Sequence, residues 1–117
     1  MEKHTGGCHC GKIRYEADLD LSEPVIECDC SHCAMKGLLL QFTTPEHFRT
    51  LAGEEDAKVY RFNKLVIDHV LCPECGVEPF GKRKNPDGSP AVAVNVRTID
   101  GIDLAALTRM PYAGKDF

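Results

Sequence analysis

Seven cysteines gather in three short blocks of this sequence. The blocks hold Cys8 and Cys10, then Cys28, Cys30 and Cys33, and finally Cys72 and Cys75. Thiolate sulfur is a soft ligand that suits tetrahedral zinc. A closed structural zinc site takes four protein ligands, whereas a catalytic site takes three and leaves one position open. The seven cysteines therefore divide into four plus three, which predicts two zinc ions per chain.

The two cysteine pairs predict the structural site, with Cys8, Cys10, Cys72 and Cys75 as ligands. The two-residue gap between Cys72 and Cys75 lets a tight turn bring both sulfurs to one ion. Cys10 and Cys72 lie 62 positions apart (72 minus 10), so this ion would close a long loop. Such a cross-link restricts the unfolded chain strongly.

The remaining trio, Cys28, Cys30 and Cys33, predicts a catalytic zinc site with an open position. An exogenous thiol bound there would be stabilised as a thiolate and so become an activated nucleophile. The alternatives are that some of the cysteines are ordinary buried thiols, that two of them form a redox pair, or that the ion is iron in place of zinc. His32 lies inside the trio and is a candidate fourth ligand that would close the site. His9, His47 and His69 are isolated in sequence, which favours solvated or hydrogen-bonded histidines.

Length and composition limit the classes of protein. The 117 residues suit one domain, residues 1–117, and a formal net charge of -4 argues against general nucleic-acid binding. The sequence contains no apolar run long enough for a membrane span and no secretory signal at its start, which predicts a cytoplasmic protein. In that compartment clustered cysteines favour metal binding over disulfides. Few aromatic residues and no Trp predict a thin, aliphatic core.

Short alternating segments with frequent turns predict a mainly β fold. We expect strands in residues 13–17, 25–27, 38–43, 58–62, 65–71, 79–83 and 91–97. We expect a loop at residues 18–24 and a turn at residues 85–88. Thr44, Pro45 and Glu46 have the pattern of a helix start, which predicts a helix through Leu51 that ends at Gly53. A helical turn is expected near Asp103, and an irregular tail from residue 109.

The cysteine blocks and their surroundings resemble the glutathione-dependent formaldehyde-activating family, which also includes centromere protein V. The similarity rests on residues 7–16, on the trio at 28–33, on Cys72 to Gly76 with Pro79 and Phe80, on 94–96, and on 111–115. It covers nearly the whole chain. It implies a single compact domain of several short, coiled antiparallel sheets held by zinc, with one or two short helices. It also implies the same two zinc sites, on the same cysteines, as the ligand count.

The family activity implied is a carbon–sulfur lyase reaction run in reverse, which joins glutathione and formaldehyde into S-hydroxymethylglutathione. Because glutathione is anionic, Lys36 is a candidate substrate contact, and Asn95 is a polar candidate in an apolar strand. Two segments depart from the family pattern: Ala34 and Met35 replace basic residues, and Val77 and Glu78 precede Pro79. Both flank the expected open site and bear on the substrate. A zinc-stabilised binding module without catalytic activity is the alternative function. Neither the oligomeric state nor the exact substrate follows from the sequence.

Overall fold

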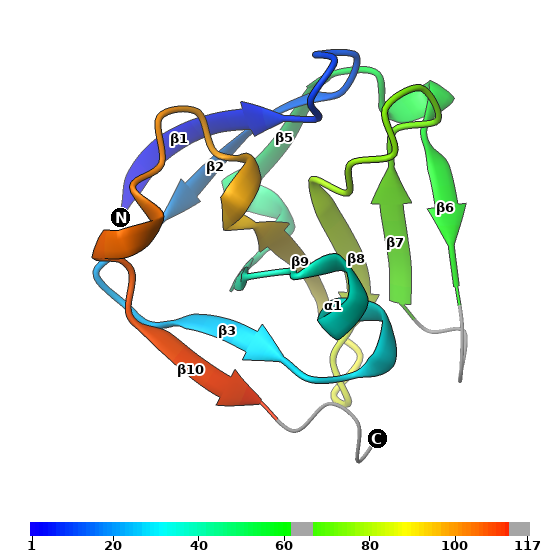
Figure 1. The fold of residues 1–117 in the computed structure, drawn as a ribbon. Coiled ribbons are helices and arrows are strands. Elements are labelled where there is room, and N and C mark those ends of the chain that lie inside the picture. Colours follow the sequence, from blue (N-terminus) through cyan, green and yellow to red (C-terminus); the bar gives the residue numbers. More distant parts are fainter. Residues whose placement is uncertain (62–66, 113–117) are drawn as a thin grey trace.

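The computed structural model describes residues 1–61 and 67–112 (Figure 1). Within these ranges the strands are β1 (Glu2–Gly7), β2 (Arg14–Leu19), β3 (Val25–Cys28), β4 (Leu40–Thr43), β5 (Phe48–Ala52), β6 (Lys58–Tyr60), β7 (Ile67–Leu71), β8 (Phe80–Lys84), β9 (Pro90–Asn95) and β10 (Arg109–Tyr112). The helical segments are α1 (Ser31–Lys36) and the 3-10 turns η1 (Pro45–His47), η2 (Glu54–Asp56), η3 (Val96–Thr98) and η4 (Leu104–Ala106). The mainly β fold with few helices is confirmed. The described part of the chain holds no helix with the length and apolarity of a membrane span.

The smaller sheet has three strands in the order β1-β2-β5, all antiparallel. Its central strand, β2, alternates as its sequence predicts, with Tyr15, Ala17 and Leu19 buried. The strand runs two residues beyond the predicted end, because Leu19 continues the same buried face. β1 was not predicted, because its first half is largely exposed and carries little apolar pattern. β1 pairs with β2, and the first cysteine block follows directly after its last residue, Gly7.

The predicted helix over residues 44–51 is wrong. Only the 3-10 turn η1 forms at the proline, and the chain then extends as β5 along β2. The physical reason is the ring of Phe48, which is buried and stacks on Tyr15 with centroids 5.5 Å apart. Two turns of helix on this short segment would gain little by themselves. Strand pairing satisfies the backbone and also places the ring in the core.

The larger sheet has the order β10-β3-β4-β9-β8-β7-β6. Its strands are antiparallel except for β10 and β3, which run parallel. The prediction of an irregular tail is therefore wrong for Arg109–Tyr112, whose backbone extends the sheet edge beside β3. The predicted strands at 58–62 and 65–71 are confirmed as β6 and β7 where described; residues 62, 65 and 66 lie outside the described residues. The predicted turn at 85–88 and the helical turn after Asp103 also form.

The core is mainly aliphatic, as expected, and it also contains a group of three aromatic rings. Tyr15, Phe48 and Phe80 contact one another, with centroids 4.7 to 6.3 Å apart. The three rings come from β2, β5 and β8, so they join the small sheet to the large one. Each aromatic side chain has a large buried area, so these few rings add much to the packing of a small core.

Candidate metal centres

Cys8, Cys10, Cys72 and Cys75 lie together, with their sulfur atoms all within 4.8 Å of one another. The Sγ atoms of Cys8 and Cys10 are 3.7 Å apart, and those of Cys10 and Cys72 are 3.5 Å apart. Four sulfurs on one zinc at 2.3 Å would be separated by about 3.8 Å. The first pair follows β1 and the second follows β7, so the cluster joins the two sheets. The predicted four-cysteine grouping is thus present in the fold, and its geometry fits a tetrahedral ion.

Cys28, Cys30 and Cys33 form a second group with the same mutual limit of 4.8 Å. Cys28 ends β3, and the next turn starts α1, whose N-cap is Cys30 with its sulfur accepting from the Cys33 amide at 3.4 Å. α1 is only six residues long because Gly37 ends it in the left-handed conformation, at φ 66°. That conformation is easily reached only by glycine. The N-cap at Cys30 and the end of the helix at Gly37 together bring the three sulfurs close to one point.

The thiol environments differ among the cysteines. Burial raises the pKa of the Cys28 and Cys33 thiols, so a cation is needed to hold them as thiolates. In the four-cysteine group burial also opposes ionisation of Cys75, but backbone amides of Val77 and Cys10 lower its pKa to about 6. Both donor sets are purely sulfur, which suits zinc. The residues present therefore fit the ions that the sequence predicts.

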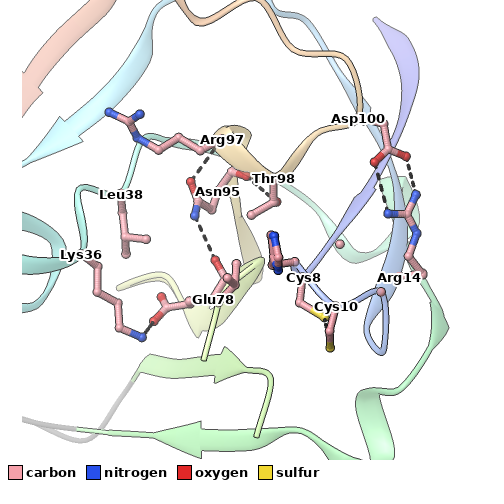
Figure 2. A pocket seen from close by; sticks show the side chains of 14 residues that line it. Cys8, Cys10, Arg14, Lys36, Leu38, Glu78, Asn95, Arg97, Thr98 and Asp100 are labelled. Carbon is pink, nitrogen blue, oxygen red and sulfur yellow. Dashed lines mark hydrogen bonds and ion pairs between the residues drawn. The ribbon is translucent and has the colours of Figure 1, made fainter. Parts of the chain in front are cut away.

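Two cavities adjoin the cysteine groups. One, of about 510 Å³, is lined by Cys28 and Cys33 of the trio. The other, of about 600 Å³, lies on the side of Cys8 and Cys10 and is drawn in Figure 2. Both volumes are within the range of small-molecule sites. The smaller cavity is the better candidate for chemistry, because of the two cysteine groups only the trio would leave a ligand position open on a tetrahedral ion.

Arg97 and Leu38 line both cavities and so form their shared wall. The Arg97 Nε donates to the Gly37 carbonyl oxygen at 2.7 Å, which fixes the side chain beside the end of α1. No described carboxylate forms an ion pair with Arg97. Sequence reasoning missed this residue because it read the segment as a continuous strand, whereas η3 turns it out of the sheet.

The predicted substrate contacts Lys36 and Asn95 both line the larger cavity (Figure 2). Lys36 donates from Nζ to Glu78 Oε1 at 3.1 Å. The Asn95 amide donates to the Glu78 carbonyl oxygen at 3.0 Å and accepts from the Arg97 amide at 3.2 Å. Asn95 is buried, and its side-chain nitrogen and oxygen both form hydrogen bonds with backbone groups. Its role as a substrate contact stays a prediction; the geometry favours a role in positioning Arg97.

A third group of donor atoms, which the sequence did not indicate, consists of His32, His69 and Glu78. His32 Nε2 is 2.7 Å from Glu78 Oε1, so this histidine faces the carboxylate rather than completing the cysteine group. His69 was expected to be solvated or hydrogen-bonded, and it is buried with Nδ1 3.1 Å from Glu78 Oε2. Burial opposes ionisation of Glu78, but hydrogen bonds from His69 and His32 lower its pKa. His47, also isolated in sequence, pairs with Asp18 at the surface.

Comparisons with known proteins support the family resemblance and the fold. The family model described as glutathione-dependent formaldehyde-activating enzyme matches residues 3–111. A crystal structure of a Rhodobacter sphaeroides protein, determined as a Northeast Structural Genomics target, is similar with a TM-score of 0.80. That protein is 25% identical, and the match covers 93% of this chain and 99% of the other.

Proposed function

We propose, from the premise that this chain belongs to the glutathione-dependent formaldehyde-activating family, that it is a zinc-dependent carbon–sulfur lyase-type enzyme. Its substrates would be a glutathione-like thiol and formaldehyde, and its product S-hydroxymethylglutathione. Cys28, Cys30 and Cys33 would hold the catalytic zinc. The four-cysteine cluster would hold a structural zinc. Residues 1–117 would act as one zinc-binding domain.

The reaction forms one carbon–sulfur bond and requires no oxidant. The thiol loses its proton, its sulfur attacks the carbonyl carbon, and the former carbonyl oxygen takes a proton; the reverse step breaks the same bond. Zinc, when bound to the trio, would lower the pKa of the thiol and fix its position. The chain's own contribution is the turn from β3 into α1, which gathers the three sulfurs, with Cys28 and Cys33 lining a cavity.

Basic side chains around the two cavities fit an anionic thiol. Arg97 lies on their shared wall, and Arg14 and Lys36 line the larger cavity. A guanidinium binds a carboxylate in a bidentate manner, which suits the two carboxylates of a glutathione-like peptide. We propose that the thiol lies at the trio and that the peptide passes Arg97 toward the larger cavity. Arg14 is already paired with Asp100, so Arg97 is the better candidate.

The proximity of three sulfurs to a cavity carries this proposal, and catalysed exchange tests it. Glutathione and ¹³C-labelled formaldehyde combine without help, so the measured quantity is the exchange rate above the spontaneous rate, by NMR. We expect acceleration by the wild type and none by Cys30→Ser. Met35→Ala is the matched control, because Met35 lies in the same helix and is 89% exposed; it should behave as wild type.

Protein that carries two zinc ions and yet gives no acceleration would contradict the enzyme. The alternative, a zinc-stabilised binding module without catalytic activity, would then be favoured. Thermal unfolding separates the cases further. Millimolar glutathione should raise the melting temperature of the wild type but not of Cys30→Ser, if the thiol reaches the trio.

A further inference from the structure

The third donor group is built like a metal site. The side chains of His32, His69 and Glu78 are 9%, 8% and 3% exposed. Charged and polar groups buried to this degree are normally paired or coordinate a metal. The three donor atoms lie within 4.8 Å of one another. The ring of Tyr60 stacks on His32 with centroids 5.4 Å apart and covers one side of the group.

The donor chemistry differs from that of the cysteine groups. Two imidazoles and one carboxylate form the set that binds iron(II), zinc and related divalent ions while leaving positions open. Glu78 Oε1 is 2.7 Å from His32 Nε2, and Oε2 is 3.1 Å from His69 Nδ1. Neighbouring ligands on one ion at about 2.1 Å are separated by roughly 3.0 Å. Both of these distances are close to that separation.

All three residues lie close in sequence to the cysteine groups. His32 lies between Cys30 and Cys33 on α1, His69 lies three residues before Cys72, and Glu78 lies three residues after Cys75. Their side chains converge from α1, from β7 and from the segment before β8. An ordered backbone of this kind reduces the entropic cost of gathering ligands.

Lys36 is the competitor for the carboxylate. Its ammonium lies 3.1 Å from Glu78 Oε1, and its side chain is 31% exposed. A divalent ion would repel this ammonium, and Lys36 could then turn into the adjoining cavity that it already lines. Metal binding would therefore free a basic group for an anionic ligand.

We propose that His32, His69 and Glu78 form a third metal site, which binds a divalent first-row transition ion. Its nitrogen and oxygen donors are harder ligands than the sulfurs of the two cysteine groups. The site is separate from the two zinc sites of the proposed function. It does not depend on which reaction, if any, the trio catalyses.

Cobalt(II) is the probe. Tag-free protein is first loaded with two zinc ions and then titrated with cobalt(II) without oxygen. We expect one further ion per chain by native mass spectrometry, with an absorption spectrum that lacks the near-ultraviolet thiolate-to-cobalt charge-transfer band of a cysteine site. His69→Gln and Glu78→Gln should bind this ion at least about tenfold more weakly. His47→Gln is the matched control and should bind it normally, since His47 belongs to none of the three groups.

Lys36→Met tests the competition, and it should bind cobalt(II) about tenfold more tightly, equivalent to roughly 1.4 kcal/mol. If the His69 or Glu78 variants lose zinc or fail to fold, an NMR measurement on the wild type still tests the site. Bound cobalt should broaden the imidazole NMR signals of His32 and His69 but not those of His4 and His47. No third ion at millimolar cobalt, undiminished binding in folded His69→Gln, or broadening centred elsewhere would each overturn the site. None of these outcomes requires the exchange assay, so the proposed function would be unaffected.

Discussion

Removing Cys10 should test how much the four-cysteine cluster stabilises the fold. Its sulfur lies 3.5 Å from that of Cys72, at a sequence separation of 62. Cys10 is exposed, whereas Cys72 is fully buried. Cys10→Ser therefore removes a ligand with little loss of packing. Where the three remaining sulfurs no longer hold the ion, the change in stability comes almost wholly from the lost link between the two sheets.

The expected magnitude follows from the length of the closed loop. A cross-link between positions 62 apart restricts the unfolded chain by about 4 kcal/mol in the loop-entropy model. Cys30→Ser provides the comparison, because the trio closes only a short loop, for which the same relation gives about 2 kcal/mol. Serine also keeps the N-cap of α1. For a protein of this size, about 4 kcal/mol corresponds to a fall in melting temperature of roughly 15 °C.

The assay is urea unfolding of both variants and wild type, each reduced and zinc-loaded, then repeated after chelation. Cys10→Ser should lose about twice the unfolding free energy that Cys30→Ser loses. Chelation should remove the difference between Cys10→Ser and wild type, because the unloaded proteins lack the link equally. Equal losses in the two variants, or a difference that persists without zinc, would refute the cross-link argument.

Three further predictions concern the fold. Gly6→Ala should destabilise by about 2 kcal/mol or more, because its Cβ would lie 2.4 Å from the Thr98 carbonyl oxygen; unchanged urea unfolding would contradict this contact. Phe80→Ala should lose about 3–5 kcal/mol in the same assay, since the ring is 1% exposed among the core aromatics; a loss below that of a surface substitution would refute its central place. The hydrogen bond from Arg14 lowers the pKa of Asp100, so Asp100→Asn should cost less than about 1 kcal/mol at neutral pH for this exposed pair. That cost should vanish as pH falls through the lowered carboxyl pKa of the folded state, because the pair stabilises only above it; a cost that persists in acid would contradict the ion pair.

The cysteine groups were predictable because their chemistry is local. Cysteines two or three residues apart readily share one ion, and only one division that keeps the three blocks intact gives four ligands for a closed site and three for an open one. The strands were predictable where one face is buried, as in β2, whose alternation is visible in Tyr15, Ala17 and Leu19. Local patterns and local metal chemistry therefore carried most of the correct predictions.

The failures have a common physical cause, which is contact between distant segments. Residues 44–51 carry the signals of a helix start, but Phe48 gains more by packing on Tyr15 in a strand. The tail from residue 109 has no strong strand pattern, and it becomes ordered by the free edge of β3. Glu78 and His32 are 46 positions apart, so no spacing rule could bring them together. Their contact is determined only once α1 and the segment before β8 are placed.

The interleaving of the three donor groups has a consequence for how the protein would load its ions. Each residue of the His32, His69 and Glu78 group lies within three positions of a cysteine from one of the two sulfur clusters. Zinc on the cysteines would therefore order the backbone that carries the nitrogen and oxygen donors. Loading would proceed from the soft-donor sites to the harder one, and loss of zinc would remove the third site as well. This order of loading also prevents competition for the third ion, because thiolates already saturated with zinc cannot capture the ion that binds the imidazoles and the carboxylate.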